Sequence, residues 1–118
     1  MASHDGLKCR KTLGKRERIH LERDFRRIFR EGKRVHTAFF TVVLCPNSLG
    51  FRRVAVVVPK KVGKAVKRNR IKRLIREFFR LNKCRLKPST DYIFVGHRGA
   101  EGLGYRQLEE ILGVLFER

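Results

Sequence analysis

The chain has 118 residues, a length typical of one domain. Thirty lysines and arginines face eleven acidic residues, which gives a formal net charge of +19. A core must form against this repulsion, so we expect a polyanionic partner rather than an inert structural role. No apolar run approaches the roughly 20 residues of a membrane span, and the N-terminus has no apolar stretch typical of a secretory signal. We therefore expect a cytoplasmic protein with no membrane partner.

The first 18 residues are polar and basic, and they predict a flexible N-terminal arm before a single domain over residues 19–118. The first predicted helix spans residues 21–31, because apolar side chains recur there on one helical face. These side chains are Leu21, Phe25, Ile28 and Phe29. Gly32 is a typical helix stop.

Two strands are predicted next, over residues 35–44 and 52–58. The residues between them, 46–50, have the composition of a hairpin turn. The second strand is almost continuously apolar, which favours burial on both of its faces. Pro59 cannot donate a ladder hydrogen bond and is expected to end this strand.

A long helix is predicted over residues 64–82, followed by a strand at 91–95, a glycine-rich loop and a last helix at 105–117. The resulting order, α-β-β-α-β-α, predicts an α/β (α+β) two-layer sandwich in which helices pack on a small mixed sheet. The usual rule makes the crossover between strands 52–58 and 91–95 right-handed if these strands are parallel neighbours.

Positive charge concentrates on residues 60–87, which hold thirteen basic residues and one acidic residue. Arginine predominates within the helix, and its planar guanidinium can hold phosphate oxygens through two parallel hydrogen bonds. Asn69 lies inside this block, where its amide could bind a base edge or a 2′-OH, or make a local backbone contact. Phe25 and Phe29 could either stack on unpaired bases or pack in the core.

No pattern indicates a protein active site or a metal site. Cys9, Cys45 and Cys84 are widely spaced, which favours reduced thiols over a zinc site or a disulfide framework. A nuclease that uses His20 and His36 is an open alternative without support from spacing.

Residues 58–77, VPKKVGKAVKRNRIKRLIRE, closely resemble the signature of the bacterial ribonuclease P protein subunit, with its Arg-Asn-Arg core at 68–70. The upstream pattern of Asp24-Phe25, Phe29, Gly32 and an aromatic at Phe40 is also similar to this family. The resemblance extends from about residue 12 to residue 117.

The resemblance implies a protein that binds the catalytic RNA and the 5′ leader of precursor tRNA, and that assists endonucleolytic removal of the leader as a monomer within the ribonucleoprotein. The chemistry and the magnesium requirement then belong to the RNA–substrate assembly, with no protein catalytic residue and no cofactor held by protein side chains. It also implies an unusual left-handed crossover at the basic helix, against the default above. The implied contacts to the catalytic RNA are Arg68, Asn69, Arg70, Lys72, Arg73 and Arg76. The implied leader-binding cleft is lined by Phe25, Phe29, Phe40, Lys60 and Lys61.

Two other functions stay open on the sequence alone. A ribosomal or RNA-chaperone-type protein would bind RNA without any role in tRNA cleavage. A protein-only nuclease would cleave RNA in the absence of a catalytic RNA.

Overall fold

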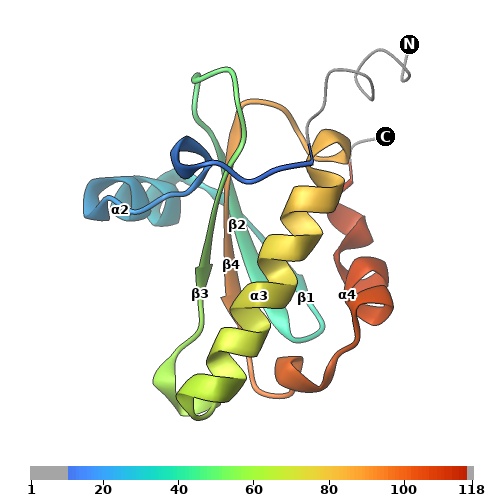
Figure 1. Cartoon of the computed structure of the whole chain (residues 1–118). Coiled ribbons are helices and arrows are strands. Elements are labelled where there is room, and N and C mark those ends of the chain that lie inside the picture. The colour runs from blue at the N-terminus through green and yellow to red at the C-terminus, as the bar shows by residue number, and fades with distance from the viewer. Residues whose placement is uncertain (1–10, 117–118) are drawn as a thin grey trace.

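The computed structural model describes residues 11–116, which fold into a mixed four-stranded sheet with three helices (Figure 1). The mixed α+β class is therefore confirmed. Five short 3₁₀ turns join these elements within the described residues. The helices and strands, in chain order, are α2 (Glu22–Glu31), β1 (Lys33–Thr37), β2 (Phe40–Pro46), β3 (Arg53–Val57), α3 (Ala65–Asn82), β4 (Thr90–Gly96) and α4 (Tyr105–Leu112).

The strand order in the sheet is β1-β2-β4-β3. β4 pairs antiparallel with β2 and parallel with β3, so α3 is the crossover between two parallel neighbours, which is the condition that the sequence analysis left open. The handedness of this crossover stays a prediction. The hairpin predicted between β2 and β3 is wrong, because β4 inserts between these two strands. Residues 46–50 have turn chemistry, but local chemistry does not specify which strands pair.

The strand predicted over residues 35–44 is a hairpin of β1 and β2, so three strands precede α3 instead of two. Ala38 and Phe39 form its tip, and Phe39 has a positive φ of 70°. The tip is held by the loop that follows β4, since His97 N donates to Phe39 O at 2.9 Å. The Phe39 ring also lies against Gly99. Long-range contacts therefore stabilise a turn that has no glycine, proline or asparagine to predict it.

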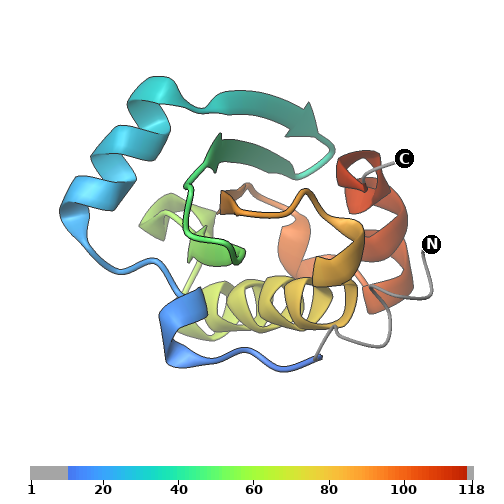
Figure 2. The same ribbon diagram turned by 90° about the horizontal axis from the view of Figure 1, so that it is seen from above.

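The core has two parts, one on each face of the sheet. α3 and α4 cover one face, and α2 covers part of the other, so α2 adds to the two expected layers (Figure 2). The α3-side cluster contains Phe40, Phe78 and Phe94, among others, and the α2-side cluster contains Ile28, Val43 and Ile93. Side chains of β3 contribute to both clusters, which agrees with the predicted burial on both faces.

The segment between residue 11 and α2 contacts β3 and the C-terminal end of α3. Lys83 Nζ donates to Thr12 O and pairs with Glu17, both at 2.5 Å, and Ile19 N donates to Val54 O at 2.9 Å. The predicted flexible arm covers residues 1–18, and its first ten residues lie outside the described part of the chain. Residues 11–18 are thus the part of the arm whose contacts are defined.

Two smaller expectations are corrected. The last helix ends at Leu112 and continues only as a 3₁₀ turn to Leu115, whereas a helix to residue 117 was expected. Cys84 is disulfide-bonded, so the expectation of three reduced thiols fails, while Cys45 is free and buried. Among the described residues, no helix is long and apolar enough to cross a membrane.

Candidate nucleic-acid interface

α3 has one buried face and one strongly cationic face. Its apolar residues Ile71, Ile75 and Phe78 are fully buried against the sheet and α4. The six residues predicted to contact RNA lie on the remaining surface of the helix and just at its start. Asn69, Arg70, Arg73 and Arg76 are exposed, and Arg68 and Lys72 are partly buried. The 3.6-residue helical repeat thus brings all six predicted residues to accessible positions.

Backbone carbonyls fix two of these arginines in place. Arg68 Nε donates to Gly63 O at 3.1 Å, and Arg70 Nε donates to Glu101 O at 2.8 Å. Each bond uses one of the five N–H donors of a guanidinium. The other donors of each fork stay available for phosphate oxygens, and the side chains lose less conformational freedom on binding.

A cavity of about 510 Å³ lies between α3 and the segment that precedes α2. Its polar lining is cationic, with four arginines and one carboxylate, and comprises Arg18, Asn69, Arg73, Arg76, Glu77 and Arg80. Partial desolvation at the wall of the cavity lowers the pKa of Arg76, and the positive charge of Arg18 lowers it further. Two guanidinium groups that repel each other in a cavity form a site for an anion, because a phosphate would relieve the repulsion.

The single carboxylate of this cavity is already engaged. Glu77 pairs with Arg80 at 2.7 Å, and this hydrogen bond lowers the pKa of Glu77. Glu77 is therefore ionised at neutral pH and neutralises Arg80 locally. The other arginines of the lining, Arg18, Arg73 and Arg76, retain their excess charge.

A second surface lies on the opposite face of the sheet, beside α2. Phe25 and Phe29 are partly buried there and pack against the α2-side cluster. Thr41, Val95 and Val57 are cross-strand partners that form a row across the sheet, and all three are only partly buried. Their row lies two residues farther along the strands than the row of Val43 and Ile93, which α2 buries. Aromatic rings beside a partly exposed apolar row provide a stacking surface of the kind that unpaired bases use.

The structure corrects the placement of Phe40, which was expected in the leader-binding cleft. Phe40 is 1% exposed and belongs to the α3-side cluster, on the other side of the sheet from Phe25 and Phe29. Side chains alternate along a strand, so Thr41 points to the α2 side and Phe40 away from it. Phe40 cannot stack on a base from this position.

Lys60 and Lys61 are exposed in the 3₁₀ turn that follows β3. Arg98 Nε, in the loop after β4, donates to Lys61 O at 3.1 Å. These cations lie where β3 and β4 end, and Val57 and Val95 are register partners near the same ends. The lysines thus border the partly exposed row beside α2.

Sequence reasoning missed several residues of these two surfaces. Arg34 lies with its guanidinium carbon 5.6 Å from the centre of the Phe29 ring and donates to Phe29 O. Arg18 lines the cavity on α3, and Arg98 contacts the lysine turn. Only the position of Arg34 could have been predicted from local sequence. If the hairpin had been predicted with its turn at Ala38 and Phe39, the alternation of side chains along the strands would have placed Arg34 on the α2 face. The others depend on tertiary contacts.

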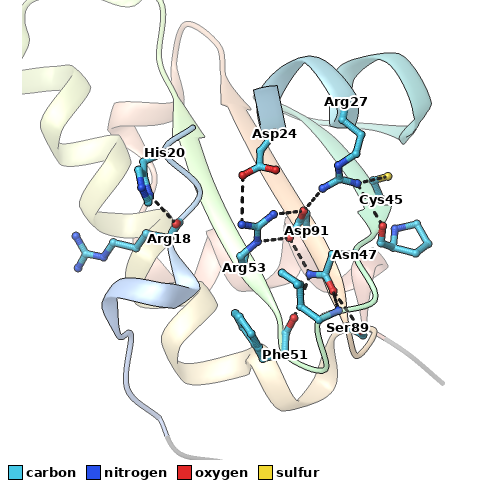
Figure 3. Close-up of polar contacts among 12 residues, drawn as sticks. Arg18, His20, Asp24, Arg27, Cys45, Asn47, Phe51, Arg53, Ser89 and Asp91 are labelled. Carbon is cyan, nitrogen blue, oxygen red and sulfur yellow. Dashed lines mark hydrogen bonds and ion pairs between the residues drawn. The ribbon is translucent and has the colours of Figure 1, made fainter. Parts of the chain in front are cut away.

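A buried ionic network attaches α2 to the sheet (Figure 3). Asp91 on β4 is 0% exposed and accepts two hydrogen bonds from Arg53 on β3, at 2.7 and 2.8 Å. Arg27 on α2 donates to the same carboxylate at 2.5 Å, and Asn47 donates at 2.8 Å. Asp24 on α2 adds a contact to Arg53 at 3.4 Å.

Electrostatics keep this buried carboxylate charged. Burial alone would raise the pKa of Asp91, but hydrogen bonds from Arg53, Asn47 and Arg27 outweigh it, and the net pKa is lowered. Arg27 lies on the same helix as Phe25 and Phe29. The network therefore fixes the position of the aromatic residues over the sheet.

Comparisons with known proteins agree with this geometry. The sequence model of the family described as Ribonuclease P matches residues 13–118. The ribonuclease P protein component of Syntrophus aciditrophicus (strain SB) is 48% identical over 107 residues, which cover 91% of this chain and 90% of that protein.

Solved structures show the same fold. The RNase P protein from Thermotoga maritima is 34% identical, with a TM-score of 0.76 over 84% of this chain and 94% of that one. The RNase P protein of Staphylococcus aureus is also 34% identical, with a TM-score of 0.76 over 86% of this chain and 98% of that one. The sequence match over nearly the whole chain and the shared fold together place this chain in the ribonuclease P protein family.

Proposed function

We propose that this chain is the protein subunit of ribonuclease P, which binds the catalytic RNA through α3 and the 5′ leader of precursor tRNA along the α2 side of the sheet. It assists the endonucleolytic removal of the leader, which produces the mature 5′ end of the tRNA. One copy acts within the ribonucleoprotein. The observation that carries this proposal is the separation of a cationic helix face from an aromatic and apolar face by the sheet.

The two faces suit two kinds of RNA. Phosphates of a folded RNA lie at fixed positions, and the arginines of α3 are themselves fixed by Gly63 O and Glu101 O. The leader is single-stranded, so its bases are free to stack on Phe25 and Phe29. The protein thus joins the catalytic RNA to a flexible part of the substrate.

The chemistry belongs to the RNA in this proposal. The protein contributes by positioning the substrate and by screening phosphate charge, which lets two polyanions approach closely. Magnesium acts in the RNA–substrate assembly. The alternative nuclease based on His20 and His36 gains no support, because the His20 ring contacts Arg18 O while the His36 ring contacts Thr41.

Two variants test the assignment of the two faces. Arg73→Ala combined with Arg76→Ala should weaken binding of the protein to ribonuclease P RNA and reduce the slope of log affinity against log salt by about two phosphates' worth. Phe29→Ala should leave that affinity unchanged, and should reduce the preference of the assembled holoenzyme for leader-bearing over leaderless tRNA by roughly five- to a hundredfold.

Arg106→Ala is the matched control, since this exposed arginine lies on α4. It should change neither quantity by more than about twofold. The assignment would be contradicted if the α3 variant lost leader preference alone, or if Phe29→Ala weakened RNA binding alone.

A further inference from the structure

Two histidines share one hydroxyl on the α2 side of the sheet. Thr41 Oγ1 lies 2.8 Å from His97 Nε2 and 3.4 Å from His36 Nδ1. The three residues come from β2, from the loop after β4 and from β1. Both imidazoles are exposed, and Thr41 is partly buried, so the cluster is open to a ligand.

The cluster lies on the floor of the proposed leader-binding surface. Thr41 pairs in register with His36 on one side and with Val95 on the other, and Val95 pairs with Val57. Cross-strand partners point to the same face of a sheet. This row follows the row of Val43 and Ile93, which α2 buries, so the cluster lies just beyond the edge of that helix.

The hydroxyl can serve the two imidazoles in two ways. A hydroxyl has one proton to donate and two lone pairs to accept. When both imidazoles are neutral, Thr41 can donate to one ring nitrogen and accept an N–H from the other. When both are protonated, both rings donate to Thr41, and its own proton must turn outward. The doubly protonated cluster thus presents two positive charges and a free O–H donor to solvent.

The groups around the histidine cluster are positively charged and would attract an anion. On β1, Arg34 lies beside Phe29, and in the loop Arg98 contacts the turn that contains Lys60 and Lys61. These cations add to the positive potential around the histidine pair. A bound phosphate would supply the negative charge that this part of the surface lacks.

The nearest acidic groups along the chain are already engaged. Glu101 Oε1 accepts a hydrogen bond from Gly99 N at 3.2 Å, and Glu31 at the end of α2 pairs with Arg30 at 3.1 Å. Neither carboxylate contacts the histidine pair. An external anion is therefore the natural counter-charge for the protonated cluster.

We propose that His36, Thr41 and His97 form a binding site for a backbone phosphate of the single-stranded leader, and that this phosphate binds together with protons on the two imidazoles. The proposal rests on the proposed function, because it places the leader on the α2 side. Coupling between two ligands is reciprocal, so protons tighten leader binding and the leader tightens proton binding. Leader affinity should rise as the pH falls through the range in which histidine titrates.

The test measures binding of an uncleavable precursor tRNA, with and without its leader, to the assembled holoenzyme at pH 6 and pH 8. The leader-dependent part of the affinity should be roughly tenfold greater at pH 6. Taking the ratio of leader-bearing to leaderless substrate removes any effect of pH on the RNA shared by both substrates.

The decisive variant combines His36→Gln with His97→Gln. Glutamine keeps hydrogen-bonding capacity but cannot take up a proton near neutral pH. In this variant the leader-dependent affinity at pH 6 should equal that at pH 8 within about twofold, so the gain at pH 6 is lost. His20→Gln is the control, since it removes another exposed histidine, and it should keep the full pH dependence.

Each other result overturns the site. An unchanged pH dependence in the double variant would show that the protons bind elsewhere. An equal loss of leader affinity at both pH values would show a contact without proton coupling. If wild-type holoenzyme prefers the leader equally at both pH values, only the site fails. If it shows no leader preference at either pH, the proposed function fails with it.

Thermal unfolding checks that the double variant is folded. If the double variant is unstable, the single variant His97→Gln replaces it and is expected to lose part of the pH effect.

Discussion

The change Asp91→Asn isolates the charge of the buried network with almost no change in side-chain shape. The wild-type carboxylate is 0% exposed and accepts four hydrogen bonds, two from Arg53 and one each from Arg27 and Asn47. Asparagine has one acceptor oxygen where aspartate has two, and its amide N–H groups would face guanidinium donors. Arg53 and Arg27 then lose their counter-charge.

The expected cost is about 3 kcal/mol in the free energy of unfolding at pH 7. Removing one partner of a buried ion pair costs about 3–5 kcal/mol, and the lower end applies because the side chains of Arg53 and Arg27 are 14% and 28% exposed and can reach some water. Since 1 kcal/mol corresponds to about 4–8 °C in Tm for a domain of roughly this size, Tm should fall by about 12–24 °C.

The loss should also depend on pH in a defined direction. The folded pKa of Asp91 is lowered, so its contribution to stability is present above the unfolded pKa of about 3.9 and is lost as the pH falls through the folded pKa. The difference in unfolding free energy between wild type and Asp91→Asn should therefore shrink below about pH 4.

Urea unfolding of wild type and variant at pH 7 and pH 3 measures these differences. Asp24→Asn is the matched control, because Asp24 contacts Arg53 only at 3.4 Å, and it should cost about 1 kcal/mol or less. A cost below about 1 kcal/mol for Asp91→Asn at pH 7, or a cost that is equal at the two pH values, would refute the reasoning.

Three more predictions concern single side chains. Phe40→Ala should lower the free energy of unfolding by about 3–5 kcal/mol because Phe40 is 1% exposed in the core, whereas Phe39→Ala, at a 39% exposed position, should cost far less in the same urea titration. Glu77→Gln should tighten binding to the catalytic RNA, since it removes the one carboxylate of the α3 cavity and frees Arg80; equal or weaker binding in a filter-binding titration would count against phosphate in that cavity. Arg18→Ala should reduce the salt slope of RNA binding by about one phosphate, and an unchanged slope would exclude Arg18 from the interface.

Local sequence patterns predicted α2 and α3 well because their apolar repeats are strong and continuous. Leu74, Ile75 and Phe78 recur at helical spacing, so both the extent of α3 and its cationic face follow from the sequence. β3 and β4 were also predicted as strands, but their parallel pairing was left open by the sequence and is established by the structure.

The errors fall where tertiary contacts decide the local structure. The turn at Ala38 and Phe39 depends on His97 and Gly99, which lie about sixty residues away, so no local pattern marks it. Missing that turn left open whether Phe39 or Phe40 faces the core, and the cleft assignment of Phe40 from family resemblance failed for this reason.

The roles of residues whose partners are distant in the sequence also could not be predicted. From the sequence, Asp91 was predicted only as the polar first residue of a strand. In the structure it is the buried centre of the ionic network that attaches α2 to the sheet. The His36–Thr41–His97 cluster likewise requires the register of three strands before its members can be placed together. Sequence periodicity assigns faces within an element, but not the neighbours of each face.

The central claim is that the protein assists a reaction that the RNA performs. The most direct test is single-turnover cleavage of a precursor tRNA by a bacterial ribonuclease P RNA at low magnesium, with and without this protein. We expect rapid cleavage only when both components are present, and none with the protein alone. Salt-sensitive RNA binding without any gain in cleavage would contradict the account and favour a ribosomal or chaperone-type protein. Cleavage by the protein alone would contradict it in favour of a protein nuclease.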